Sequence, residues 1–252
     1  MKPPSWLYGL QDYFDFEDDF VAKLFVDQLI SVYFSDNKAN SVKNLCLADS
    51  GDPNEKLSRF NFYFKLLEDE PIDFVETVSV MRKRLPDVDM LDIFHKYGRN
   101  GFNMNALADA FSRGQIRSKI WLIEELQKIS PKFDNILIYA GWMGQLVRFF
   151  DQHINFDKIR VIDQDPEACH ISDKIINNHL ITDWKVKSSC MKIEDIEQFL
   201  NHCTVPLTNA AGETFPTKFV PDLIVNTSAE HMDEQWFYNI KQNSIIAIQS
   251  NN

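Results

Sequence analysis

Hydrophobic and polar residues follow two different patterns in the two halves of this chain. In the first half the apolar positions recur every three or four residues, which is the period of an amphipathic α-helix. Prolines and glycines separate these periodic stretches. The pattern predicts helices over residues 19–34, 56–68, 72–85, 90–97, 104–112 and 115–129. Residues 1–130 are therefore predicted to form an all-helical N-terminal domain.

After residue 130 short apolar runs alternate with helical segments. The runs lie at residues 135–140, 159–163, 184–188, 222–226 and 244–249. The helical segments lie at about residues 145–153, 166–179, 193–201 and 233–242. Apolar strands alternating with helices are typical of a parallel sheet covered on both faces, and right-handed crossovers make such a sheet doubly wound. Residues 131–252 are therefore predicted to form an α/β domain with a doubly wound, mainly parallel five-stranded sheet.

Candidate ligand-binding residues follow the first two expected strands. The first strand runs through residues 139–144, which include Gly141, into a helix. A glycine there lets the backbone approach a ligand, and the helix N-terminus offers free amides, although a plain turn also explains it. The second strand ends at Asp163, 22 residues after Gly141. In doubly wound folds an acid at this position binds ribose hydroxyls, while Asp165 before Pro166 predicts a helix cap.

Residues 136–144 and 162–168 together resemble the first two motifs of class I S-adenosylmethionine-dependent methyltransferases. The resemblance implies a Rossmann-like core that binds S-adenosyl-L-methionine through the glycine loop, the acid after the second strand, and the ends of the third and fourth strands. Carried over to this chain, it assigns the cofactor to Gly141, Trp142, Gly144, Asp163, Gln164, Ser189, Cys190, Met191 and Asn226. Two departures stand out. The bulky Trp142 occupies a loop of normally small residues, and Ser189 stands where the family often has an acid near the adenine.

The expected fourth strand leads into the densest polar cluster of the chain, residues 226–232. His231 and Glu230 are the catalytic candidates, since either side chain can take a proton from an acceptor. Thr227 and Ser228 are candidates for substrate binding, although residues of these types also cap helices. The resemblance further implies that the helix before the first strand packs beside the cofactor loop. That helix adds two substrate-binding candidates, Gln115 and Lys119, which also suit a capped surface helix.

Composition narrows the range of partners. The chain carries 37 acidic against 26 basic residues, a net charge of -11, and such a surface repels phosphate backbones, so nucleic-acid binding is not expected. No apolar run reaches the roughly 18 residues of a membrane helix, and no signal-peptide core follows the first residues, so a cytoplasmic location is expected. The four cysteines lack ligand spacing, so they are expected to be free thiols and no metal site is expected.

The sequence thus predicts methyl transfer from S-adenosylmethionine to an unidentified small-molecule or macromolecular acceptor, a reaction that depends on in-line positioning. The alternative is a structural or interaction protein of methyltransferase fold with weak or lost catalysis. Trp142 favours it, as does the end of the sequence after the fifth strand, where the family usually adds two more. We expect either a minimal core or a truncated form. A nicotinamide enzyme is third, because Tyr139 replaces the first glycine of the dinucleotide fingerprint.

Overall fold

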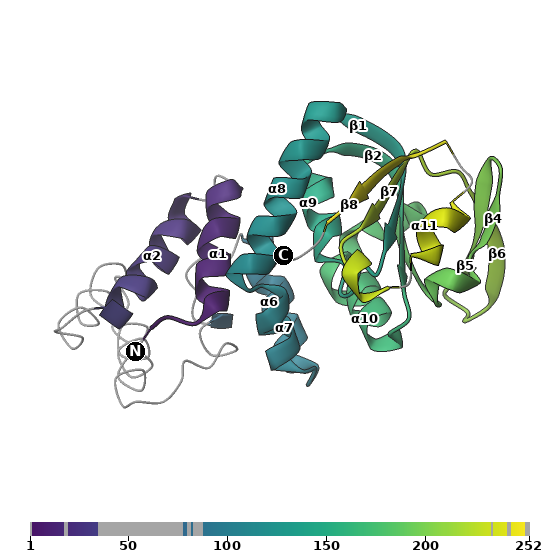
Figure 1. Ribbon diagram of the computed structural model, residues 1–252. Helices are drawn as coiled ribbons and strands as arrows, with labels where there is room; N and C mark the ends of the chain where they lie inside the picture. The colour runs from purple at the N-terminus through teal and green to yellow at the C-terminus, as the bar shows by residue number, and fades with distance from the viewer. Residues whose placement is uncertain are drawn as a thin grey trace. The chain divides into compact units, whose positions relative to one another are not determined.

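In the computed structural model, five parallel strands form the sheet of the second half of the chain (Figure 1). They are β1 (Lys132–Tyr139), β2 (Asn155–Asp163), β3 (Val186–Cys190), β7 (Leu223–Asn226) and β8 (Ile245–Ile248). Their order across the sheet is β3-β2-β1-β7-β8, and each neighbouring pair runs parallel. The predicted five-stranded parallel sheet is confirmed. After β1 the chain adds β2 and β3 on one side of β1, and later β7 and β8 on its other side. A topological switch point therefore lies between β1 and β7, and open α/β sheets bind ligands at such points.

The structure describes residues 2–17, 20–34, 78–79, 82, 88–232, 234–240 and 243–249. The predicted helix 56–68, and all but three residues of the predicted helix 72–85, lie outside these residues. The chain divides into two compact units, Met1–Arg117 and Ser118–Asn252. This division falls inside helix α8 (Arg113–Ile129). The domain boundary expected after residue 130 stays a prediction.

Helices that follow β1 and β2 cover one face of the sheet (Figure 1). The first, α9 (Gln145–His153), joins β1 to β2, and α10 (Pro166–Ile171) follows β2. The carboxylate of Asp165 caps α10 by accepting hydrogen bonds from the amides of Glu167 at 2.8 Å and Ala168 at 3.4 Å, which confirms the predicted cap. The helical path continues past α10 as a π-helical turn (Ser172–Ile176) and a 3-10 turn (Asn178–Leu180).

The crossover between β3 and β7 differs from the expectation. The predicted helix over residues 193–201 is wrong: its helical part is one 3-10 turn (Ile193–Asp195). Next comes an antiparallel sheet of β4 (Glu197–Phe199), β5 (His202–Thr208) and β6 (Thr214–Phe219), in the order β4-β5-β6. In β5 the buried residues Cys203, Val205 and Leu207 alternate with more exposed ones, which is the period of a strand. The segment predicted as a helix therefore holds a 3-10 turn and strand β4, which pairs with β5.

The antiparallel sheet and α11 (Gln235–Asn239) cover the second face of the parallel sheet (Figure 1). Side chains from both sheets and from α11 form one apolar core, made of Leu137, Tyr139, Ile162, Ile196, Cys203, Val205, Leu207, Phe219, Ile224 and Trp236. Tyr139 packs edge-on against Trp236, with ring centroids 5.8 Å apart, and its hydroxyl accepts a hydrogen bond from Gln198 Nε2 at 3.1 Å. Burial raises the pKa of Tyr139, so this phenol stays protonated within the core.

The described part of the first unit is helical. It contains α1 (Ser5–Phe16), α2 (Phe20–Phe34), α6 (Asp89–Arg99), α7 (Met104–Ala110) and the start of α8. The predicted helices 19–34, 90–97, 104–112 and 115–129 correspond to the last four, whereas the sequence reasoning missed α1. Its buried face, Trp6, Leu7, Leu10, Tyr13 and Phe14, carries the spacing that signals a helix. An all-helical domain over residues 1–130 stays a prediction. No helix in the described residues is both long enough and apolar enough to span a bilayer.

Candidate functional site

A cavity of about 410 Å³ opens where the carboxyl ends of β1, β2, β3 and β7 meet. Its size lies in the range of small-molecule sites, and its position is the switch point of the sheet. The lining residues come from the segments that follow these strands: Ala140, Trp142, Asp163, Gln164, Met191, Lys192, Ile193, Glu194, Ser228, His231 and Met232. Of the residues singled out from the sequence, the structure thus gathers Trp142, Asp163, Gln164, Met191, Ser228 and His231 around one cavity.

The loop after β1 has an unusual backbone. Ala140 and Trp142 have φ values of 47° and 46°, and Gly144 has a φ of 76°. Positive φ is easy for glycine but costs other residues about 1–2 kcal/mol each, and such residues concentrate at ligand sites. Asp163 holds the loop in this form, because its Oδ2 accepts a hydrogen bond from the amide of Trp142 at 2.8 Å. Trp142, which lines the cavity, therefore has a strained backbone conformation.

Replacing Ala140 with glycine should raise the free energy of unfolding by about 0.5–1 kcal/mol. Glycine avoids the cost of about 1–2 kcal/mol that a left-handed backbone imposes on alanine. Part of this gain is lost, because glycine raises the conformational entropy of the unfolded chain. Denaturant unfolding measures the change, with Ala168→Gly as the matched control. Ala168 lies in α10 with ordinary helical geometry, so its replacement should destabilise by about 1 kcal/mol or more. Equal destabilisation by both substitutions would contradict a strained loop.

Asp163 has acceptor capacity left for a ligand. Its Oδ1 accepts a second hydrogen bond, from the amide of Asp165 at 2.9 Å. A carboxylate offers about four lone-pair sites, and the loop and the turn use two of them. Since Asp163 also lines the cavity, the remaining sites can accept hydrogen bonds from ligand hydroxyls.

The two glycines of the loop serve close packing. A Cβ on Gly141 would lie 2.3 Å from Val161 Cγ1, and one on Gly144 would lie 2.3 Å from Ser172 Oγ. Neither glycine is among the cavity-lining residues. Their missing side chains thus let the loop sit tightly on β2 and on the helical segment after α10.

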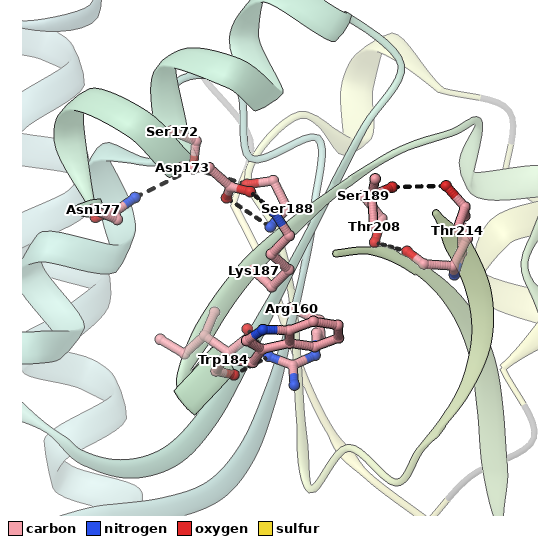
Figure 2. Close-up of polar contacts among 12 residues, drawn as sticks. Arg160, Ser172, Asp173, Asn177, Trp184, Lys187, Ser188, Ser189, Thr208 and Thr214 are labelled. Atoms are coloured by element: carbon pink, nitrogen blue, oxygen red, sulfur yellow. Dashed lines mark hydrogen bonds and ion pairs between the residues drawn. The ribbon is translucent and has the colours of Figure 1, made fainter. Parts of the chain in front are cut away.

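A buried polar network anchors the end of this loop (Figure 2). Asn177 Nδ2 donates to the carbonyl of Gly144 and to Ser172 Oγ, both at 3.2 Å. The hydroxyl of Ser188, on β3, donates to the same Ser172 Oγ at 3.0 Å. The loop, the π-helical turn and β3 are therefore joined by side-chain hydrogen bonds that the sequence reasoning missed.

An ion pair completes the network. Asp173, which is 5% exposed, lies 2.5 Å from Lys187 Nζ, and its other oxygen accepts a hydrogen bond from the amide of Ser188 at 2.8 Å (Figure 2). A buried carboxylate is stable when it is paired and hydrogen-bonded in this way. The pair therefore fixes the π-helical turn against β3.

The segment after β3 supplies a cavity wall that the sequence reasoning only partly foresaw. Met191 lines the cavity as expected, and Lys192, Ile193 and Glu194 join it from the 3-10 turn and the residue before it. The sequence reasoning assigned Ile193 and Glu194 to a helix over residues 193–201 and did not single out Lys192. Glu194 supplies a carboxylate near the end of the third strand of the sheet.

Ser189 and Cys190 have other surroundings. Ser189 is buried, and its hydroxyl donates to the carbonyl of Pro206 in β5. The exposed Cys190 has its thiol 3.6 Å from the carbonyl of Gln164. Neither lines the cavity, so Ser189 links the two sheets and Cys190 lies beside the turn after β2.

The end of β7 brings the catalytic candidates together. His231 lines the cavity, and its Nε2 lies 3.4 Å from Oε1 of Glu230. The His231 side chain is 74% exposed and that of Glu230 is 27% exposed. Histidine and glutamate side chains can both exchange protons, so the pair offers a candidate proton acceptor beside the cavity.

Asn226 holds the turn that carries these residues. It is fully buried, its Oδ1 accepts a hydrogen bond from the amide of Ser228 at 2.9 Å, and its Nδ2 lies 3.4 Å from Met232 Sδ. Ser228 and Met232 line the cavity, whereas Asn226 and Thr227 do not. Asn226 therefore supports the wall of the cavity from behind.

The remaining candidates lie on α8. Lys119 belongs to the second unit, is 6% exposed and does not line the cavity. Gln115 belongs to the first unit, and its substrate-binding role stays a prediction.

Among the described residues no group of three or more His, Cys, Asp or Glu side chains is placed to hold a metal ion. Burial raises the pKa of the free thiols Cys169 and Cys203 to about 12.

Comparisons with known proteins give only distant likenesses. No protein-family model and no curated protein matches the sequence. A putative S-adenosyl-L-methionine-dependent methyltransferase from Methanococcus maripaludis is 15% identical, with a TM-score of 0.36 over 56% of this chain and 64% of its own. The plantazolicin methyltransferase BpumL, in complex with a triazolic desmethylPZN analog and SAH, is 14% identical, with a TM-score of 0.31 over 66% of this chain and 54% of its own. The chain spans less than two thirds of each, and likenesses this weak carry no argument about activity.

Proposed function

We propose that the second unit binds S-adenosylmethionine in the cavity at the ends of β1, β2, β3 and β7, and transfers its methyl group to an acceptor. One observation carries the proposal: Asp163 fixes a left-handed loop and also lines a cavity of about 410 Å³. At the end of the second strand of a doubly wound sheet, an acid of this kind accepts hydrogen bonds from ribose hydroxyls.

The lining residues fit the parts of this cofactor. The free acceptor sites of Asp163 suit the ribose hydroxyls. Met191 and Ile193 offer apolar contact for the adenine ring, and Glu194 offers an acceptor for its amino group. The described lining holds two carboxylates, Asp163 and Glu194, and one lysine, Lys192. This excess of negative charge suits the positively charged sulfonium of the cofactor.

The residues of the β7 turn would handle the acceptor's proton. When bound, the cofactor supplies an electrophilic methyl group, and in-line positioning of the acceptor supplies much of the rate. His231 Nδ1 takes the proton from the acceptor, while Glu230 orients the ring through Nε2. Ser228, beside His231 in the lining, positions the acceptor.

Calorimetry with S-adenosylmethionine, S-adenosylhomocysteine and NAD tests the cofactor. The first two should bind and NAD should not, because the pyrophosphate of NAD needs a glycine-rich turn whose first glycine is replaced here by Tyr139. Transfer of label from S-adenosylmethionine to a native cell extract then tests the reaction. Absence of cofactor binding together with absence of transfer would leave a structural or interaction role for this fold.

Replacing Asp163 with alanine should weaken cofactor affinity by about ten- to hundredfold, because it removes a charge-assisted hydrogen bond of about 1.5–3 kcal/mol. Asp163→Asn keeps the shape and one acceptor oxygen, so its loss should be smaller. The matched control is Asp165→Asn, which changes a carboxylate two residues away that caps α10 and does not line the cavity. Unchanged affinity in a folded Asp163→Ala protein would remove the ribose assignment.

A further inference from the structure

Trp142 is the one Phe, Tyr or Trp residue among the described residues that line the cavity. Its amide donates to Asp163, but within the described part of the chain its indole ring makes no hydrogen bond and no contact with another aromatic ring. Its backbone is strained, with a φ of 46°. A large ring that lines a cavity, lacks a polar or aromatic partner there and has a strained backbone is typical of a ligand contact.

The order of the strands places Trp142 between the two ends of the proposed site. Strand β1, which leads into the Trp142 loop, lies between β2, which ends at Asp163, and β7, which leads to the turn of His231. The carboxylate of Asp163 is bonded directly to the amide of Trp142, at 2.8 Å. A group that is attached to a ribose held by Asp163 and directed toward His231 therefore passes Trp142.

The group in that position is the sulfonium of S-adenosylmethionine, which joins the ribose to the methyl group. An aromatic face attracts a cation through its quadrupole, and among the aromatic side chains tryptophan does so most strongly. The attraction depends on the charge, which the sulfonium carries and the thioether of S-adenosylhomocysteine lacks. An indole ring at this place therefore distinguishes the cofactor before methyl transfer from the product after it.

We infer that the indole ring of Trp142 faces the sulfonium and makes the cavity select S-adenosylmethionine over S-adenosylhomocysteine. This role rests on the proposed function, because it needs the cofactor to occupy this cavity. Asp163 sets the geometry, since the same carboxylate fixes the Trp142 amide and accepts the ribose hydroxyls. Loss of the methyl group removes the charge and with it the attraction to the ring, which favours release of the product.

The test is calorimetry on the whole chain with three ligands that share the adenosyl group. S-adenosylmethionine carries a sulfonium, sinefungin carries an ammonium group on the carbon that replaces the sulfur, and S-adenosylhomocysteine carries a neutral thioether. Trp142→Leu keeps an apolar side chain but has no aromatic face. It should lower the affinity of the two cations, relative to that of S-adenosylhomocysteine, by about three- to thirtyfold.

Trp121→Leu is the matched control, because Trp121 is 52% exposed on α8 and does not line the cavity. It should leave the relative affinities unchanged. A Trp142→Leu protein that loses affinity for all three ligands by the same factor would place the ring against the adenosyl group and overturn the inference. Unchanged affinity for all three would overturn it as well.

A second variant keeps the test decisive if Trp142→Leu does not fold. Trp142→Phe retains a smaller aromatic face, so it should lower the relative affinity of the two cations by about two- to fivefold. The stoichiometry of binding reports the folded fraction in each sample. Relative affinities equal to those of the unaltered chain in a folded Trp142→Phe protein would then overturn the inference.

The cofactor proposal and the role of Trp142 fail in different ways. If the unaltered chain binds neither S-adenosylmethionine nor S-adenosylhomocysteine, both are wrong. If the unaltered chain binds both ligands and Trp142→Leu lowers the two affinities equally, the role of Trp142 is wrong while the cofactor proposal stands.

Discussion

Replacing Asp173 with alanine is expected to lower the free energy of unfolding by about 3–5 kcal/mol, because it leaves a buried charge without its partner. Asp173 is 5% exposed, and the side chain of its partner Lys187 is 15% exposed. The alanine also removes the acceptor for the amide of Ser188, so a second polar group loses its hydrogen bond inside the protein. Urea unfolding followed by circular dichroism measures the loss.

The exposed pair Lys128–Glu125 is the matched control. Its atoms lie 2.6 Å apart, close to the 2.5 Å of the buried pair, but its side chains are 67% and 41% exposed. Glu125→Ala should therefore change the free energy of unfolding by less than about 1 kcal/mol. The double variant Asp173→Asn with Lys187→Met should lose less than Asp173→Ala, because it removes both charges and keeps an acceptor for Ser188. Losses of similar size for Asp173→Ala and Glu125→Ala would contradict a structural role for the buried pair.

The second large effect concerns turnover. His231→Ala and Glu230→Ala should leave cofactor affinity within a few fold, while at least one of them lowers turnover by roughly 10²-fold or more. In the proposed mechanism His231 takes the acceptor's proton and Glu230, 3.4 Å from it, orients its ring, so neither is needed to hold the nucleoside. Asn226→Ala should instead harm binding or orientation, since its buried amide holds the turn.

Turnover is measured with labelled S-adenosylmethionine, and stability is measured on the same samples. His170→Ala is the matched control, because His170 lies on α10, is exposed and does not line the cavity. A purely structural site predicts a different result: the three substitutions would change only stability, by about 0.5–2 kcal/mol, through lost turn and cap contacts. Full turnover in both the His231 and the Glu230 variants would exclude the proton-transfer role.

The order of β1, α9, β2 and α10 could be read from local patterns in the chain. Strand cores are continuous apolar runs, and α9 carries apolar residues at helical spacing, so each element specifies itself over about ten residues. Asp165 and Pro166 mark the start of α10 by local hydrogen bonding. For the same reason the position of Asp163, at a strand end, was predictable before any tertiary contact was known.

The antiparallel sheet on the second face was decided by tertiary structure. Residues 197–199 are a short polar-rich segment with no clear period of their own, and they become β4 because they pair with β5. The alternation in β5 was visible in the sequence, but the burial of Cys203, Val205 and Leu207 depends on the parallel sheet beneath them. β4 and β5 are consecutive along the chain, but the strands that bury β5 come from residues 132–139, 155–163 and 223–226, so periodicity in one segment does not reveal this packing.

The sequence by itself determined which strand ends border the cavity, because carboxyl ends of parallel strands meet at one edge. It did not determine which side chains at that edge line the cavity. Asn226 and Ser189 make hydrogen bonds inside the protein and do not line the cavity. Lys192 and Glu194 line it, because residues 193–195 form a 3-10 turn in place of a longer helix. Side-chain direction at a strand end depends on the turn that follows and on the layer packed above it, and both are set only when the sheets assemble.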